Sequence, residues 1–182
     1  MKNKVDFAKF DNSWYSTDRS ITVRIIWMLV SSVIFKSNFF PLYGVKTFLL
    51  RIFGASIGDN FVIKPCVNIK YPWKLHIGDH VWIGERVWID NLAPVFIKNN
   101  VCLSQGAILI TGNHDYKKIS FDLKICQIHL EDGVWIGAGS IVGPGVVCRN
   151  NSVLCLGSVA TKEMSENSIY QGNPAIKIKD RF

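Results

Sequence analysis

His114 is the side chain of this 182-residue sequence whose type and setting best suit it to chemistry. It stands in the segment TGNHDY, directly after LSQGAILI and beside Asp115. Histidine is the residue whose ordinary pKa lies closest to neutral pH, so a positioned imidazole can remove the proton of a hydroxyl group as that oxygen attacks. Asp115 and Asp90 are candidates for orienting the imidazole. The alternatives are a histidine on a solvated loop and aspartates at solvated turns.

A metal centre is not indicated by the remaining histidines and cysteines. His76, His80 and His129 are isolated along the chain, and no histidine follows His114 at a spacing suited to a shared metal ion. The five cysteines are an odd number and contain no CxxC pair. We therefore predict a reducing compartment, with neither disulfides nor a metal site.

The formal net charge is +7, with lysines and arginines scattered rather than clustered. No nucleic-acid-binding motif accompanies them, so nucleic acid is not a predicted partner. The phosphates of a coenzyme or anionic lipid headgroups are the preferred targets. A basic surface without any partner remains the alternative.

An aliphatic residue returns every six residues through most of the chain, often followed by glycine. The clearest members of the series are Ile57, Ile63, Ile69, Leu75, Ile77, Ile83, Ile89, Ile97, Leu103, Leu130, Ile136, Val142, Cys148, Leu154 and Ala160. Six is the period of a solenoid with short flat faces, not that of a helix or a flat amphipathic strand, so the fold class is an all-β solenoid. Three sixes make a triangular coil, which predicts that Ile57 stacks on Leu75, and Leu130 on Cys148. A β-sandwich has no use for a strict six-residue repeat and is rejected.

The chain divides into an N-terminal segment, residues 1–53, and a solenoid domain, residues 54–182. Within the solenoid domain the repeat fails over a loop at residues 110–127, and a tail covers residues 163–182. Residues 21–53 are apolar with few cations and predict a pair of short helices, the second from about Val45 to Phe53. The first apolar run has 15 residues, which is short for a membrane span of roughly 20.

Two interpretations of these helices are open. They pack on the solenoid end or on a neighbouring subunit, or they form an interfacial anchor with Trp27, Phe35, Phe39 and Phe40 in the headgroup layer. Trp82 and Trp88 end successive repeats and could stack on sugars or pack against another subunit, with packing preferred. No signal peptide is recognisable, so we expect a cytoplasmic protein, in the anchor interpretation at the inner face of the membrane.

Residues 54 to 179 resemble the hexapeptide-repeat acyltransferases, which form left-handed parallel β-helices. HDY in the loop, LSQGA before it, GVWIGAGSIVGPGV and GNPA after it, and the apolar N-terminus together resemble the branch of colanic acid biosynthesis acetyltransferases. The resemblance implies that His114 is the general base and that Asn91, in WIDNLAP, binds the substrate hydroxyl. Ser104 and Gln105, close before His114, could line the acceptor cleft.

The resemblance also implies a groove for coenzyme A along the C-terminal coils. Small residues there would let the pantetheine arm lie against the backbone, and the N–H of Ala138 would serve the oxyanion. The expected contacts are Ala138, Gly139, Leu156, Gly157, Ser158, Thr161, Lys162 and Lys179. Leu156 replaces the family's usual alanine and is expected to bulge into this groove. Plain coil packing is the alternative for each small residue.

We therefore predict an O-acetyltransferase that moves an acetyl group from acetyl-CoA to a sugar hydroxyl, in exopolysaccharide biosynthesis. A homotrimer and a sugar or lipid-linked saccharide acceptor follow from the same resemblance. The alternatives are an acetyltransferase for another small acceptor and a non-catalytic β-helical scaffold or membrane-surface module. The acceptor and its hydroxyl cannot be read from the sequence.

Overall fold

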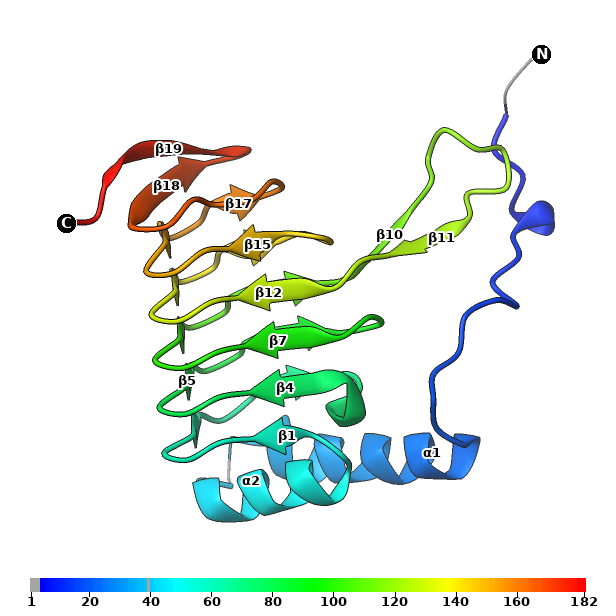
Figure 1. Cartoon of the computed structure of the whole chain (residues 1–182). Helices are drawn as coiled ribbons and strands as arrows, with labels where there is room; N and C mark the ends of the chain where they lie inside the picture. Colours follow the sequence, from blue (N-terminus) through cyan, green and yellow to red (C-terminus); the bar gives the residue numbers. More distant parts are fainter. Residues whose placement is uncertain (1–3, 39) are drawn as a thin grey trace.

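The structure is a computed structural model that describes residues 4–38 and 40–182. It is a parallel β-solenoid with helices across one end and an arm projecting from its side (Figure 1). Sheet A, in front in Figure 1, consists of β1 (Ser56–Ile57), β4 (Leu75–Ile77), β7 (Val95–Ile97), β12 (Ile128–Leu130) and β15 (Val147–Cys148). This architecture confirms the predicted all-β solenoid with a helical N-terminal segment.

The other two faces of the prism are sheets B and C. Sheet B consists of β2 (Val62–Ile63), β5 (Trp82–Ile83), β8 (Cys102–Leu103), β13 (Trp135–Ile136), β16 (Val153–Leu154), β18 (Ser168–Gly172) and β19 (Ala175–Asp180). Sheet C consists of β3 (Asn68–Ile69), β6 (Trp88–Asp90), β9 (Ile108–Ile110), β14 (Ile141–Val142) and β17 (Val159–Ala160). The chain passes through the sheets in the order A, B, C in each coil, so three corners separate the faces.

Aliphatic side chains at the repeat positions fill the prism. Leu130 pairs with Cys148 and Ile136 with Leu154, and all four are buried, as the 18-residue spacing predicts. Ile57 pairs with Ile77 rather than Leu75, so that prediction is wrong. The reason is a 3-10 turn, η3 (Pro72–Lys74), which lengthens the coil before β4.

The corner between sheets A and B is built from Asp and Asn residues that repeat along the prism. The Asp59 N–H donates to the Asp79 carboxylate at 2.7 Å, and the Asp79 N–H donates to the Asn99 amide oxygen at 2.8 Å. Asn60 and Asn100 adopt positive φ values of 54° and 57°, a conformation that asparagine tolerates better than most residues. The polar corner motifs therefore terminate each strand and bind the next coil.

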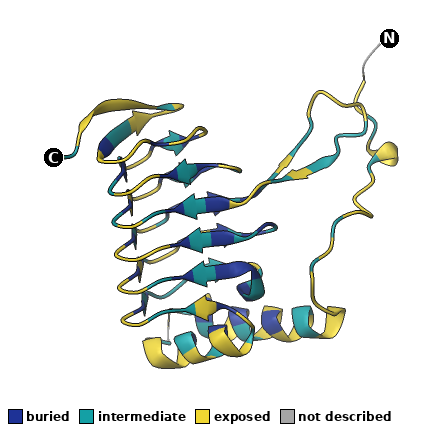
Figure 2. Ribbon diagram, in the orientation of Figure 1, coloured by how far each residue is buried: buried dark blue, intermediate teal, exposed yellow. Residues whose placement is uncertain are grey.

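Helices α1 (Ile21–Val30) and α2 (Tyr43–Ile52) cover the first coil, joined by a π-helical segment, η2 (Ser31–Phe35). Trp27, Phe35 and Leu50 belong to the same buried cluster as the coils, on the dark inner side of the helices in Figure 2. Trp27 also donates its indole N–H to the Ile69 carbonyl at 3.0 Å. Trp27 and Phe35 therefore pack on the solenoid, and their predicted place in a lipid headgroup layer is wrong. Phe39 lies outside the described residues.

Within the described ranges, neither helix is long and apolar enough to cross a membrane. Both nevertheless expose apolar side chains, among them Leu29 of α1 and Phe48 and Ile52 of α2. In Figure 2 the exposed residues of the helices lie mainly on the side facing away from the coils.

The arm, residues 111–127, leaves the solenoid between sheets C and A. It contains the antiparallel strands β10 (Gly112–His114) and β11 (Leu123–Ile125). An N-terminal strap, residues 4–20 with the 3-10 turn η1 (Phe7–Lys9), runs from this arm to α1 along the outside of the molecule (Figure 1). The Asp6 N–H donates to the Ile119 carbonyl at 2.9 Å, and Trp73 donates to the Thr17 carbonyl at 2.7 Å. The strap thus joins the arm to the first coils.

The predicted tail is partly a β-hairpin. Strands β18 and β19 pair antiparallel, and β18 continues sheet B beside β16. Residues 168–180 therefore extend sheet B at the end opposite the helices.

Candidate active site

His114 is the last residue of strand β10, directly before the loop that joins β10 to β11, and it is half-buried. Its Nδ1 lies 2.9 Å from the carbonyl oxygen of Phe121. A carbonyl can only accept a hydrogen bond, so this contact favours the neutral tautomer with the proton on Nδ1. Nε2 is then the unprotonated nitrogen, which is the arrangement a general base requires.

Two aromatic rings enclose the imidazole. The Phe121 ring stacks on it with centroids 4.3 Å apart and planes 8° apart, and the Phe10 ring from the strap lies at 5.8 Å. Phe121 adopts a φ of 53°, a region that a bulky residue rarely occupies. One residue in this unusual conformation therefore supplies both the carbonyl and the stacking ring for His114.

Asp115 does not orient the imidazole, and that prediction is wrong. Its carboxylate forms an ion pair with Lys124 at 2.8 Å and accepts the Lys117 N–H at 3.2 Å. The bond from Lys124 lowers the pKa of Asp115 below its usual value. Asp90 is also committed elsewhere, to Lys70 at 2.8 Å. The backbone of Phe121 takes the role that the sequence assigned to a carboxylate.

Asn91 is fully buried and does not face a cleft. Its side-chain oxygen accepts the Tyr71 N–H at 2.9 Å, and its amide nitrogen donates to the Tyr71 carbonyl at 2.7 Å. Both ends of the amide therefore bind the backbone of the preceding coil. The prediction that Asn91 binds a substrate hydroxyl is corrected to a structural role between two coils.

Six of the other predicted residues meet along one edge of the prism, the B–C corner, where each coil passes from sheet B to sheet C. These are Ser104, Gln105, Ala138, Gly139, Leu156 and Gly157. The Gly139 N–H donates to the Gln105 carbonyl at 2.9 Å, and the Gly157 N–H donates to the Ala138 carbonyl at 2.8 Å. Gly139 and Gly157 have positive φ values of 64° and 66°, and a side chain on either would point into open space. The edge therefore presents exposed backbone, interrupted by Leu156, whose side chain is 76% exposed.

Ser158 does not contribute to this exposed edge. Its side chain is buried and accepts the Gly172 N–H at 3.0 Å, because its repeat position points into the prism. The prediction that it contacts a coenzyme is therefore wrong. Thr161 and Lys162 are exposed after β17, at the corner between sheets C and A, and Lys179 is exposed on β19.

Ser104 and Gln105 line a hollow of about 240 Å³ on sheet B, next to the B–C corner. Trp82, Lys64 and Glu85 line the same hollow, and the Trp135 indole donates to the Ser104 hydroxyl at 2.9 Å. This hollow is large enough for part of a small polar substrate.

His114 and the exposed edge at the B–C corner lie at different corners of one chain. His114 follows sheet C and precedes sheet A, whereas Ala138 and Gly157 lie between sheets B and C. Sheet C lies between these two corners.

Among the described residues, no group of His, Cys, Asp and Glu could hold a metal ion.

Sequence reasoning missed Phe121 and Phe10. The role of Phe121 depends on a backbone carbonyl, which every residue carries, so its type gave no signal. Phe10 is one of two apolar aromatic residues in the otherwise polar segment before Trp14, and this was a weak signal.

No family model matches the chain. A curated relative, WcaF of Escherichia coli, whose name assigns it to acetyl transfer in colanic acid biosynthesis, is 36% identical over 156 residues, covering 86% of each chain. The galactoside O-acetyltransferase of Escherichia coli is 29% identical over 136 residues, covering 72% of this chain and 66% of that protein.

Solved structures share the fold. The hexapeptide-repeat acetyltransferase VCA0836 of Vibrio cholerae, crystallised with acetyl coenzyme A, superposes with a TM-score of 0.81 at 22% identity. The match covers 92% of this chain and 91% of that one. This likeness confirms the left-handed parallel β-helix predicted above.

Proposed function

This chain belongs to the hexapeptide-repeat acetyltransferases, and from that premise we propose that it acetylates a saccharide hydroxyl group with acetyl-CoA as the donor. The observation that carries the proposal is the His114–Phe121 contact. The bond from Nδ1 to a carbonyl leaves Nε2 free to accept the proton of an acceptor hydroxyl.

The proposed reaction is a direct transfer. Nε2 of His114 takes the hydroxyl proton as the acceptor oxygen attacks the thioester carbonyl, and a tetrahedral oxyanion forms. Collapse breaks the carbon–sulfur bond, and the proton on Nε2 passes to the departing sulfur of coenzyme A. The acceptor leaves as an ester, and the base regains its starting state.

The exposed B–C corner is the proposed binding site for the donor. Among the described residues, no acceptor binds the Ala138 N–H, so this donor is available to an oxyanion. The open backbone at Gly139 and Gly157 suits an extended pantetheine chain, and Lys162 or Lys179 could meet its phosphates.

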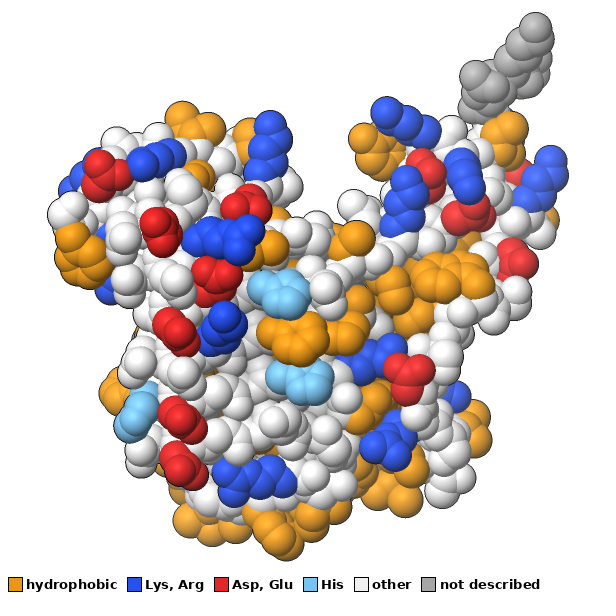
Figure 3. Space-filling model, in the orientation of Figure 1, with side chains coloured by type: hydrophobic (Ala, Val, Ile, Leu, Met, Phe, Trp, Pro, Cys, Tyr) orange, Lys and Arg blue, Asp and Glu red, His pale blue; other side chains and the backbone are white. Residues whose placement is uncertain are grey.

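A homotrimer would complete the site, because base and groove lie at different corners of one chain. Two faces support such an assembly. Trp82 and Trp135 project from sheet B, 57% and 47% exposed. On sheet A the Phe96 ring stacks between His76 and His129, with centroids 4.7 Å apart on both sides, and Figure 3 shows this column. We propose that sheet A of one subunit packs on sheet B of the next.

Mixed oligomers test the shared site. Co-expression of His114→Ala with Gly157→Trp should restore about a quarter of wild-type activity, because some interfaces then combine an intact base with an intact groove. The control carries both substitutions on one chain and is co-expressed with itself. No recovery in the mixture would contradict the shared site.

The exopolysaccharide role is supported by the name of the WcaF relative. A lipid-linked acceptor would suit the apolar outer side of α1 and α2, which forms the lower rim in Figure 3. We propose that this surface rests on an anionic bilayer. Phe48→Ser, at a position that is 62% exposed, should weaken sedimentation with phosphatidylserine vesicles, whereas Ile176→Ser, at 65% exposed on the opposite end, should not. Equal effects of the two substitutions would contradict a bilayer contact.

The function itself is tested by incubating the protein with acetyl-CoA and a panel of saccharides. Release of free coenzyme A together with a gain of one acetyl group in a saccharide is the expected result. A chain that neither binds coenzyme A in a thermal-shift assay nor acetylates any acceptor would instead be the non-catalytic scaffold.

A further inference from the structure

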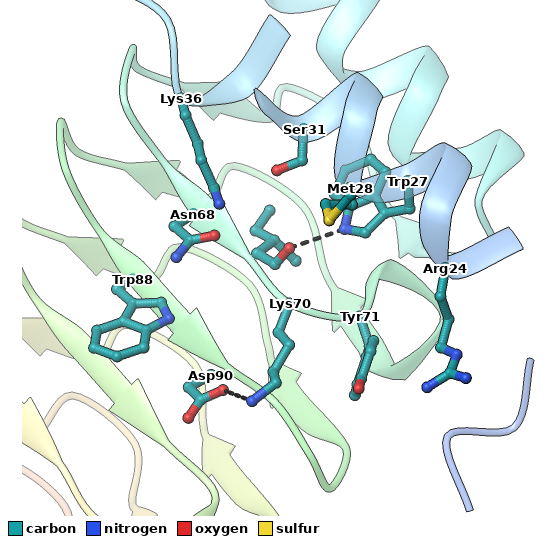
Figure 4. Close-up of a pocket in the computed structure, with 11 residues that line it drawn as sticks. Arg24, Trp27, Met28, Ser31, Lys36, Asn68, Lys70, Tyr71, Trp88 and Asp90 are labelled. Carbon is teal, nitrogen blue, oxygen red and sulfur yellow. Dashed lines mark hydrogen bonds and ion pairs between the residues drawn. The ribbon is translucent and has the colours of Figure 1, made fainter. Parts of the chain in front are cut away.

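A second hollow lies on sheet C, where the helices meet the first coils, and no step of the proposed transfer uses it. It measures about 290 Å³ and lies between α1, the π-helical segment η2 and strands β3 and β6 (Figure 4). The hollow on sheet B next to Ser104 is separate, because the two are on different faces of the prism.

The π-helical segment supplies Ser31 to this hollow, and Lys36 directly follows that segment. The Lys36 N–H donates to the Ser31 carbonyl at 2.9 Å, which closes the wide turn, and both Ser31 and Lys36 line the hollow. Ser31 is only 3% exposed, and its hydroxyl has no hydrogen-bond partner among the described residues. In Figure 4 this hydroxyl points into the hollow. A buried hydroxyl without a partner destabilises a fold, and this one is available to a ligand in the hollow.

The charges around the hollow are unbalanced. Arg24, Lys36 and Lys70 face a single carboxylate, Asp90, which is paired with Lys70 at 2.8 Å. Among the described residues, Lys36 and Arg24 have no carboxylate partner, and the Arg24 Nε is buried without a hydrogen bond. Figure 4 shows the two cations on opposite sides of the hollow, so one negative group of a ligand would pair with one of them.

The wall of the hollow on sheet C, formed by Trp88, Asn68 and Asp90, has side chains suited to binding a sugar. The Trp88 indole is 41% exposed and offers a flat apolar surface at the edge of the hollow. Asn68 and the second oxygen of Asp90 can bind hydroxyl groups beside it. We propose that this hollow binds a saccharide unit carrying an anionic group, with the ring on Trp88 and the negative charge at Lys36.

The bound unit would be a distal part of the acceptor. Asp90 pairs with Ile110, four residues before His114. Strand spacing and rise place the two α-carbons, of Asp90 and His114, within about 18 Å of each other. An oligosaccharide held in the hollow could therefore extend toward the base. This inference rests on the proposed function, because it identifies the acceptor of the same transfer as an acidic saccharide.

Calorimetric titration of the full chain tests the inference with three probes: a uronic-acid tetrasaccharide, a hexose 1-phosphate and a neutral tetrasaccharide. At least one anionic probe should bind about tenfold more tightly than the neutral one, since a hydrogen bond to a charged group is stronger than one between neutral groups. Preference for the first probe identifies a carboxylate, and preference for the second identifies a phosphate. Equal binding of all three probes, or no binding, overturns the proposal.

Matched variants locate the site. Trp88→Ala should weaken binding of the preferred probe about tenfold, whereas Trp14→Ala, at an exposed tryptophan in the N-terminal strap, should leave it unchanged. Lys36→Gln should remove the preference for the anionic probe. Ser31→Ala should weaken binding without lowering the melting temperature, because it removes an unsatisfied hydroxyl. Equal losses from Trp88→Ala and Trp14→Ala would overturn the assignment to sheet C.

The two proposals fail in different ways. His114→Ala should bind the preferred probe like the wild type while losing turnover. Turnover on neutral acceptors without any preference for anionic probes would leave the proposed function standing and remove this inference. Tight binding of the anionic probe that depends on Trp88, without turnover on any acceptor, would leave the binding site standing and remove the proposed function.

Discussion

The coils and the arm hold their side chains in place by different means. In the coils, Ile136 lies between Leu103 and Leu154 of the adjacent coils, and the same kind of contact recurs along the prism. In the arm, His114 depends on Phe121 within the same hairpin and on Phe10 from the far end of the chain. The coils are stabilised by repetition, whereas the arm is stabilised by a few particular contacts.

This difference separates stability from reactivity. Substitutions inside the coils remove contacts from a continuous core and should lower the free energy of unfolding. Substitutions around His114 remove contacts from a half-buried arm and should change turnover while leaving the coils folded. The four predictions below test this separation, from the largest expected effect to the smallest.

Replacing His114 by alanine should have the largest effect. Loss of a general base lowers turnover by about a hundredfold to ten-thousandfold. Affinity for coenzyme A and the melting temperature should change little, because the proposed groove for coenzyme A is at the B–C corner, whereas the contacts of His114 are with Phe121 of the arm and Phe10 of the strap. Steady-state kinetics and coenzyme titration measure the two quantities. Unchanged turnover would remove His114 from the mechanism.

Replacing Ile136 by alanine should act on stability instead. It leaves a cavity between Leu103 and Leu154, which destabilises a core by about 2–5 kcal/mol. Chemical denaturation measures the loss, with Ile176→Ala, at an exposed position, as the control. If the loss were no greater than in the control, the coils would not form the cooperative core described here.

Replacing Phe10 by alanine tests the strap. Aromatic pairs contribute about 0.5–1.5 kcal/mol beyond burial, so turnover should fall by about three- to tenfold through a less well held imidazole. Trp14→Ala is the control, because Trp14 is in the strap and 56% exposed but packs on Tyr15 rather than on the arm. A larger loss of melting temperature than of turnover would show that the strap serves the fold and not the base.

Replacing Asp115 by asparagine should have the smallest effect. The pKa of Asp115 is lowered in the folded chain, chiefly by Lys124, so its ion pair stabilises the fold above the ordinary aspartate pKa of about 4 and loses this effect as the pH falls through the lowered value. The variant should melt slightly lower than the wild type at pH 7, and the difference should vanish in acid. A loss of turnover comparable with that of His114→Ala would restore Asp115 to the catalytic machinery.

The six-residue period was enough to predict the solenoid and to locate its interruption. A residue repeated every six positions has its contacts one coil away, so the pattern records neighbours that recur along the whole chain. The same reasoning isolated His114, because it falls where the repeat fails. The six residues of the B–C corner could also be grouped, since a corner position in one coil predicts the same corner in the next.

The contact partners of these residues could be seen only in the folded chain. The period does not say which way an irregular corner turns its side chains, so Asn91 was expected in a cleft and is buried against Tyr71. The bond from His114 to Phe121 uses a backbone carbonyl, which has no signature in a side-chain pattern. Phe10 and His114 are roughly a hundred positions apart, and the sheet C hollow joins η2 to β6. Each of these contacts occurs once in the fold, so a repeating sequence pattern cannot predict them.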